Sequence, residues 1–118
     1  MSRRDDLGRL RDMLSHARMA VRFTEGRTQR DLETDAMLGL ACLRALEIVG
    51  EAASRISPEF RNAHPEFSWR EMIAMRNRLI HAYADVDSAV IWSIIAKELP
   101  PLIAALERLV PPEGSAPP

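Results

Sequence analysis

The sequence predicts an all-α protein: a four-helix bundle with a short extra helix or turn and a last helix kinked at prolines. Apolar residues recur at helical spacing along most of the chain, and no window shows the alternation expected of a β-strand. The hydrophobic fraction of 47% is that of an ordinary globular protein. With 118 residues the chain suits one domain, because each half alone would be too small to bury a good core.

Two helices are predicted in the first half of the chain. The i, i+3, i+4 spacing of the first is carried by Leu7, Leu10, Leu14, Ala17 and Val21. This helix should end near Gly26. Asp31 is a plausible N-cap for a long second helix that runs to about Arg55 and stops before Ser57 and Pro58, since proline disfavours a helical residue before it.

The second half predicts a short helical turn and two further helices. Glu59 to Ala63 forms the turn. Ser68, with Glu71 three residues later, has the pattern of a capping box for a helix over residues 69–82. Asp87 or Ser88 begins the last helix, which should kink or divide at Pro100 and Pro101 and resume to about residue 110.

We expect residues 1–110 to form the domain and residues 111–118, PPEGSAPP, to be a disordered proline-rich tail. The start of the chain has no apolar signal region, and no apolar run approaches the length of a membrane span. These features predict a soluble cytoplasmic protein without a membrane partner. The lone Cys42 excludes an internal disulfide, and its apolar helical surroundings favour a buried thiol.

Charge is distributed unevenly along the chain. Residues 1–30 contain eight arginines and four acidic residues, a net charge of +4, whereas the remaining 88 residues contain eight basic and 13 acidic residues, a net charge of −5. The overall net charge of −1 gives no general reason to expect nucleic acid. An arginine-rich first helix could contact phosphates, or it could simply be a solvated helix face.

The segment over residues 69–83, WREMIAMRNRLIHAY, carries the most chemistry. On a helix, its apolar side chains fall within an arc of roughly 120° centred on Arg76. The members of this arc are Trp69, Met72, Ile73, Leu79, Ile80 and Tyr83. A permanently charged group in such a stripe needs a carboxylate, a bound anion or a water-filled cleft. Glu47 and Glu51 are candidate ion-pair partners, and Arg70 and Arg78 point away toward solvent.

His81 lies five residues after Arg76, roughly 140° around an ideal helix, so the two do not share a face. They can converge only if the helix unwinds near His81 or if a second subunit completes the site. Taken alone, a histidine near a helix end suits a structural role beside the helix dipole, and Tyr83 suits packing. The three histidines are scattered, and no cluster has the spacing of metal ligands.

Arg76-Asn77-Arg78-Leu79-Ile80-His81 has the R-x4-H spacing that is typical of HEPN ribonucleases, and Tyr83 extends it to the R-x4-H-x-Y form of HepT-like toxins. Flanking segments also resemble that family. They are residues 48–53 (IVGEAA), 64–71 (HPEFSWRE), 85–87 (DVD) and 99–102 (LPPL). The resemblance covers nearly the whole chain apart from the tail.

The resemblance implies a metal-independent endoribonuclease, without a cofactor, that works as a homodimer with both motifs lining one cleft. Arg76 and His81 would be catalytic, with Asn77 and Glu51 as supporting candidates. A nucleotidyltransferase antitoxin of the MntA type would neutralise this toxin by adding AMP to the Tyr83 hydroxyl. Two alternatives remain open: a catalytically silent HEPN module that binds nucleotide or a partner protein, and a helical interaction domain with Arg76 in a salt bridge.

Overall fold

The computed structural model describes the backbone of residues 3–82 and 87–112, and the side chains of residues 5–79 and 87–112. Within these ranges all regular structure is helical, as the sequence predicts. The elements are α1 (Arg3–Phe23), α2 (Gln29–Thr34), α3 (Ala36–Ser54), α4 (Pro58–Ala63), α5 (Trp69–Ala82), α6 (Ser88–Ser93), a π-helix η1 (Ile94–Glu98) and α7 (Leu99–Leu109). Of the predicted tail over residues 111–118, residues 113–118 lie outside the described residues.

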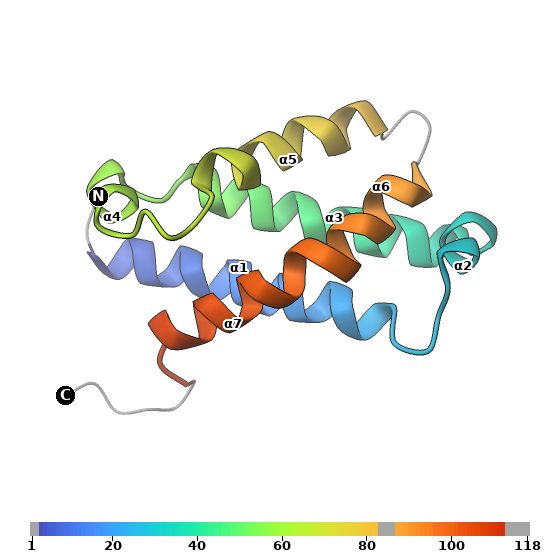
Figure 1. The fold of residues 1–118 in the computed structure, drawn as a ribbon, viewed down its shortest axis with the longest axis horizontal. Coiled ribbons are helices and arrows are strands. Elements are labelled where there is room, and N and C mark those ends of the chain that lie inside the picture. The colour runs from blue at the N-terminus through green and yellow to red at the C-terminus, as the bar shows by residue number, and fades with distance from the viewer. Residues whose placement is uncertain (1–2, 83–86, 113–118) are drawn as a thin grey trace.

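Helix α3 is central to the bundle. It packs against α1 on one side and α5 on the other, and α6, η1 and α7 run in series across the front (Figure 1). An ion pair at 2.8 Å between Arg18 of α1 and Glu107 of α7 links these two helices. Helices α1, α3 and α5 therefore lie side by side, and the α6–η1–α7 segment packs across them as the fourth helix of the bundle.

The second predicted helix is divided in two, which corrects the assignment of Asp31 as its N-cap. Thr28 is the N-cap of α2, and Asp31 completes a capping box with it. The chain then leaves helical geometry at Asp35, whose side chain accepts a hydrogen bond from the Leu38 N–H and caps α3. A glycine with φ +70°, Gly26, makes the turn out of α1, as its position predicts.

The other predicted boundaries agree closely with the structure. Ser57 caps α4, with Pro58 in its first turn, and Asp87 caps α6 by accepting hydrogen bonds from two backbone N–H groups. The Leu99 N–H bonds the Ile94 carbonyl, five residues back, just before Pro100. Proline has no N–H and crowds the carbonyl four residues earlier, so the helix widens by one residue here and continues.

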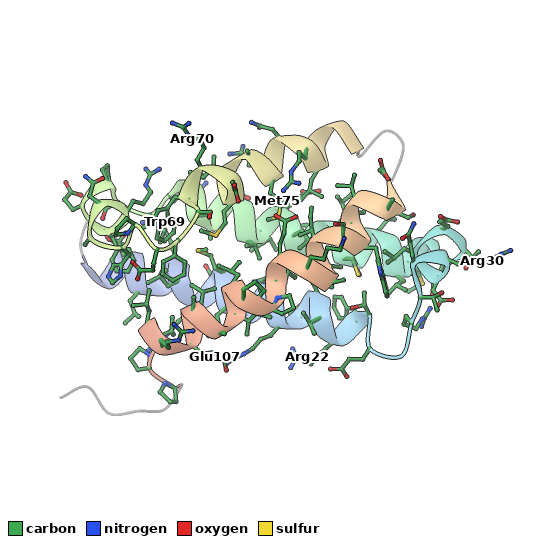
Figure 2. The ribbon with its side chains drawn as sticks, viewed as in Figure 1. Arg22, Arg30, Trp69, Arg70, Met75 and Glu107 are labelled. Carbon is green, nitrogen blue, oxygen red and sulfur yellow. The ribbon has the colours of Figure 1, made fainter. Side chains whose placement is uncertain are left out.

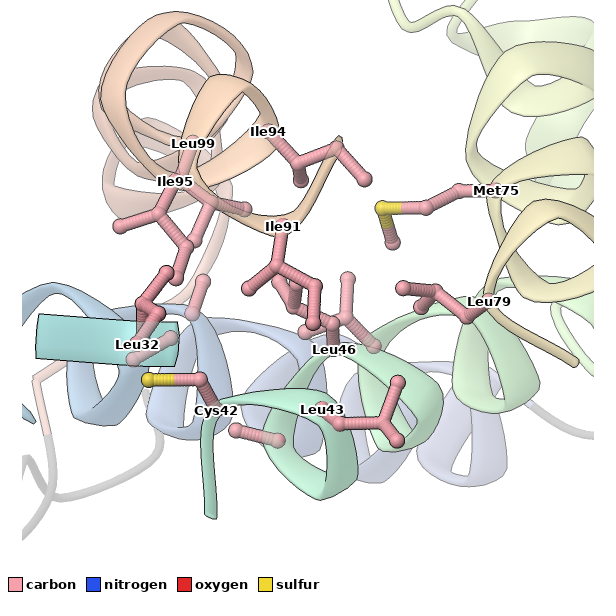
Figure 3. Packing of buried hydrophobic residues seen from close by; sticks show 14 residues of the cluster. Leu32, Cys42, Leu43, Leu46, Met75, Leu79, Ile91, Ile94, Ile95 and Leu99 are labelled. Carbon is pink, nitrogen blue, oxygen red and sulfur yellow. The ribbon is translucent and has the colours of Figure 1, made fainter. Parts of the chain in front are cut away.

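The main core cluster lies between α3, α5 and the α6–η1 segment. Met75 and Leu79 of α5 point toward Leu46, Ile91 and Ile94, and all five side chains are buried (Figure 3). Cys42 is also fully buried in this cluster, and desolvation raises the pKa of its thiol to about 11. The predicted buried, unreactive thiol is confirmed.

Residues Ser88–Leu109 form one continuous helical stretch of 22 residues, and its most apolar 18-residue window has a mean hydropathy of 1.6. By length and composition alone this stretch could cross a membrane, so the sequence-based statement that no segment approaches that length needs correction. Five of its apolar side chains, Ile91, Ile94, Ile95, Leu99 and Leu106, are buried against the other helices. Buried residues make up 28% of its most apolar window, so burial in the bundle accounts for only part of its apolar character.

Candidate active site

Helix α5 carries the residues of the predicted motif. The Ser68 carbonyl accepts a hydrogen bond from the Met72 N–H at 3.0 Å, which places residue 68 at the start of the helix. The helix then continues without a break to Ala82. Arg76, Asn77 and His81 thus all belong to one regular helix, and their directions follow from its geometry.

The buried face of α5 is not centred on Arg76. Trp69, Met72 and Leu79 are buried as predicted, but Met75 is buried too, and Arg76 itself is exposed. The buried face is therefore centred roughly 45° from Arg76, on the side of Met75. Arg76 lies at the edge where the packed face meets solvent, a position in which a guanidinium keeps its hydration.

On the side of Arg76 that faces away from Met75, the apolar stripe continues but is not fully buried. Ile73 is only partly buried. Arg70 and Arg78 are exposed, as predicted, and Figure 2 shows Arg70 pointing away from the bundle while Met75 points inward. Arg78 bonds Glu98 of η1 at 3.3 Å, on the opposite flank of α5 from Ile73.

Arg76 is held close to α3 through its main chain. A methyl group built on Gly50 would lie 3.1 Å from the Arg76 Cβ and 3.2 Å from the Met72 carbonyl oxygen. The two helices therefore approach each other backbone to backbone at this point, a distance that glycine accommodates without displacing α5. Sequence analysis did not single out Gly50, although a glycine inside an apolar helix is itself a signal of close packing.

The alternative of an ion pair between Arg76 and Glu47 or Glu51 of α3 is not seen among the described side chains. Glu47 instead pairs with Arg44, at 3.5 Å, and Glu51 pairs with Arg55, at 3.3 Å. For Arg76 itself, the described part of the chain provides no ion pair or hydrogen bond. The Arg76 guanidinium is thus exposed and available to an anion, while the backbone and Cβ of Arg76 are packed against α3.

The two supporting candidates lie near Arg76 in different ways. Asn77 is exposed, one residue further along α5 and roughly 100° around the helix from Arg76. Glu51 follows Gly50 directly in α3, so its backbone is adjacent to the contact with Arg76, and its carboxylate is partly exposed. Both side chains reach solvent and can present hydrogen-bonding groups without needing burial.

The backbone of His81 lies in the last turn of α5, but its side chain is outside the described residues, as is all of Tyr83. Because α5 remains helical to Ala82, the helix does not unwind between Arg76 and His81. Positions 76 and 81 of a regular helix are roughly 140° apart around its axis and about 7.5 Å apart along it. Of the two routes by which the residues could converge, unwinding of α5 between them is not seen.

The remaining histidines have local partners. His16 Nδ1 lies 2.8 Å from the Asp12 carbonyl oxygen, and His64 Nδ1 lies 3.1 Å from a Glu66 carboxylate oxygen. A search of the described residues finds no group of three or more His, Cys, Asp or Glu side chains that could hold a metal ion.

An all-α bundle that presents an arginine on one helix, with a histidine five residues later in the same helix, fits the HEPN class of ribonucleases. The chain belongs to the HepT-like family within it, because the family described as "Ribonuclease HepT-like" matches residues 13–109. It is similar to a Thermococcus cleftensis protein named "Probable ribonuclease HepT", with 39% identity over 100 residues that cover 85% of this chain and 91% of the relative.

A second relative, from Methanocaldococcus jannaschii and named "Putative RNase", is 36% identical over 107 residues, covering 91% of this chain and 98% of its own. A third, from Caldanaerobacter subterraneus and also named "Putative RNase", is 34% identical over 104 residues, covering 88% of this chain and 93% of its own. No solved structure matches the chain. Family and fold are thus both those that the sequence predicts.

Proposed function

We propose that this protein is a metal-independent endoribonuclease, the toxin of a toxin–antitoxin pair, and that it acts as a homodimer in the cytoplasm. The observation that carries the proposal is the state of Arg76: exposed, anchored against Gly50 and without an ion-pair partner in the described part of the chain. A structural arginine would be expected to have a partner. An arginine that binds the phosphate of a substrate would be kept available for it.

In this mechanism the RNA supplies its own nucleophile. The 2′-hydroxyl attacks the adjacent phosphorus, its proton passes to a general base, and the bond to the 5′-oxygen breaks as that oxygen takes up a proton. His81 suits the proton transfers, because histidine titrates near neutral pH. Arg76 suits the stabilisation of the extra negative charge on the phosphorane-like transition state. Asn77 and Glu51 assist by hydrogen bonding.

The geometry of α5 supports the dimer. Positions 76 and 81 of a regular helix are roughly 140° apart around its axis, so a second copy is the route by which we expect an arginine and a histidine to meet. A two-fold axis beside α5 would place Arg76 of one copy opposite His81 of the other, and would do so twice. Ile73, partly exposed beside Arg76, supplies apolar surface for such an interface.

Expression in bacteria tests the proposal. Wild type should stop growth and degrade RNA, whereas Arg76→Ala and His81→Ala should not. Losing the charge stabilisation or the proton transfer should each slow cleavage by about 10²-fold or more. Arg70→Ala, which removes an exposed arginine from another part of α5, is the matched control and should remain toxic. Purified protein should cleave RNA in excess EDTA, and equal activity of all variants would rule the proposal out.

Regulation is proposed through Tyr83. A nucleotidyltransferase antitoxin would transfer AMP from ATP to the Tyr83 hydroxyl, with release of pyrophosphate. The added phosphate would then compete with RNA for Arg76. Co-expression with a neighbouring nucleotidyltransferase should add AMP masses to wild type and none to Tyr83→Phe; an unmodified wild type, or a modified Phe variant, would contradict this role.

The alternative function, a catalytically silent module that binds nucleotide or protein, uses the same exposed Arg76. It predicts that Arg76→Ala loses binding of a nucleotide although wild type never cleaves RNA. The cleavage assay with purified wild-type protein separates the two functions.

A further inference from the structure

A second concentration of arginines lies on α1, away from α5. Three side chains, Arg11, Arg18 and Arg22, are spaced by seven and four residues, so they follow one stripe of the helix. Together with the end of α7 they line an open groove of about 400 Å³. Figure 2 shows Arg22 and Glu107 at the lower edge of the bundle, with Arg70 of α5 at the opposite edge.

The charge in this groove is unbalanced. Its lining includes three guanidinium groups and one carboxylate, that of Glu107, which leaves a net charge of +2. The Glu107 carboxylate already forms an ion pair with Arg18, at 2.8 Å. Arg22 is exposed, and within the described ranges it has neither an ion pair nor a hydrogen bond. The groove therefore keeps a positive potential although the whole chain carries a net charge of −1.

Arg11 gives a second and independent indication of a ligand. Its Nε atom is buried and has no hydrogen-bond partner in the described structure. A buried charged donor without an acceptor is unfavourable, and such donors in native proteins usually meet a water or an ion. Leu14 and Val110 are among the residues that line the groove together with the charged side chains. Such apolar groups screen charge less than water does, so they strengthen the attraction of the arginines for an anion.

We infer that this groove binds the sugar–phosphate backbone of single-stranded RNA, at a site separate from the cleavage site on α5. The three arginines extend along α1 for about 16 Å, which suits a linear chain of regularly spaced anions better than a single carboxylate. The planar guanidinium fork matches pairs of phosphate oxygens. The identity of the polyanion as RNA rests on the proposed ribonuclease function.

The arrangement of the helices makes this groove a binding site and not a part of the catalytic one. Helices α1 and α5 lie on opposite sides of α3 (Figure 1). When one part of an RNA strand lies in the cleavage site, the groove could therefore bind another part of the same strand, further along its backbone. Such contacts raise affinity for all sequences alike, because phosphates carry no sequence information.

The test compares two double variants of the full chain with equal charge. Arg11→Gln/Arg22→Gln removes the two groove arginines, whereas Arg30→Gln/Arg70→Gln removes two exposed arginines elsewhere. A fluorescent 2′-O-methyl RNA of twelve nucleotides is the probe, because it presents phosphates and cannot be cleaved through its 2′-oxygen. Thermal unfolding followed by circular dichroism checks that both variants fold.

The groove variant should bind this RNA at least about tenfold more weakly than the control variant at equal salt. Its plot of log affinity against log salt concentration should be less steep by about 1.4, which corresponds to two lost phosphate contacts. Equal affinities and equal slopes for the two variants would overturn the inference. So would tighter binding at the groove of a poly-glutamate peptide with the same charge as the RNA, which would assign the groove to an acidic protein.

Failure of the proposed ribonuclease function and failure of the groove inference give different results. If wild type cleaves no RNA but only the groove variant loses binding, the ribonuclease assignment fails and the groove stands. If wild type cleaves RNA and the groove variant binds like the control, the groove fails and the ribonuclease stands.

Discussion

Gly50 of α3 lies directly beneath Arg76 of α5, so close that a methyl group on Gly50 would be 3.1 Å from the Arg76 Cβ. The same methyl group would meet two backbone atoms of α5, the Met72 carbonyl oxygen at 3.2 Å and the Arg76 nitrogen at 3.4 Å. These atoms cannot move independently of the helix. The distance between α3 and α5, and with it the position of the Arg76 side chain, is therefore fixed by the absence of a side chain at residue 50.

Gly50→Ala should accordingly weaken both stability and activity. Helix α5 would have to shift by a few tenths of an ångström, because only backbone and Cβ atoms face the new methyl group. Overpacking should outweigh the gain in helix propensity and lower the free energy of unfolding by about 1–2 kcal/mol. Displacement of Arg76 should reduce RNA cleavage at least several-fold. Urea unfolding and a cleavage assay on the same preparation measure both effects.

The matched control is Gly8→Ala in α1. A Cβ at Gly8 meets no atom within 4 Å, so alanine should only add helix propensity and stabilise the protein by about 1 kcal/mol. Its cleavage rate should not change. If Gly50→Ala behaved like Gly8→Ala in both measurements, the contact would not be positioning Arg76.

Subunit mixing should reveal whether Arg76 and His81 act across the dimer. In a heterodimer of Arg76→Ala and His81→Ala, one of the two Arg–His pairs in the shared cleft has its arginine from one subunit and its histidine from the other, both intact. Random reassociation of the two inactive homodimers should therefore restore about a quarter of wild-type activity, since half of the dimers are mixed and each has one complete site. The measurement is RNA cleavage after unfolding and joint refolding.

If the two residues acted within one subunit, no mixed dimer would contain a complete site, and joint refolding would leave the mixture inactive. Refolding of each variant alone is the necessary control. A protein that stays monomeric at micromolar concentration by light scattering would also contradict the shared cleft.

Several parts of the fold could be predicted because their signals are local. Ser57 before Pro58, and Asp87 before an apolar run, define helix starts through interactions within three residues. The break at Asp35 was missed because Asp31 offers the same signal four residues earlier. Thr28, three residues before Asp31, resolves the ambiguity. Thr28 is the N-cap of α2, and Asp31 is the third residue of that helix and completes the capping box.

The site was predictable only in part, because its geometry depends on contacts between distant segments. The spacing of residues in α5 shows that Arg76 interrupts an apolar stripe, yet periodicity cannot show which side of the stripe meets α3. The buried position of Met75 and the close approach at Gly50 decide that, and both depend on tertiary packing. Local pattern therefore identified the arginine, and only the fold revealed that it lies at an exposed edge.

The two aspartates at the α2–α3 junction should make that junction sensitive to acid. Hydrogen bonds from backbone N–H groups, of Thr28 to Asp31 and of Leu38 to Asp35, lower the pKa of both carboxyl groups; for Asp35 the Arg27 side chain adds to this. A lowered folded-state pKa means that the stabilisation is complete above the unfolded pKa of about 3.9 and is lost as pH falls through the folded value.

Amide hydrogen exchange at Leu38 should therefore accelerate as pH is lowered below about 4, after correction for intrinsic rates. Asp35→Asn keeps an oxygen that can cap α3 but does not titrate, so its corrected exchange at Leu38 should depend less on pH over the same range. The same pH dependence in the variant and in wild type would show that the Asp35 cap is not responsible.

Asp6 should be a major determinant of stability, because it joins the first turn of α1 to α4 across 51 residues of sequence. Its buried carboxylate accepts hydrogen bonds from the Ser57 N–H at 2.9 Å and the Ser57 hydroxyl at 2.6 Å. Asp6→Ala would leave both donors buried without an acceptor, and should cost about 2–4 kcal/mol of unfolding free energy. Asp12→Ala, which removes an exposed carboxylate of the same helix, should change it by less than about 0.5 kcal/mol. Urea unfolding midpoints measure the difference, and equal midpoints for the two variants would show that water replaces the Asp6 carboxylate at no cost.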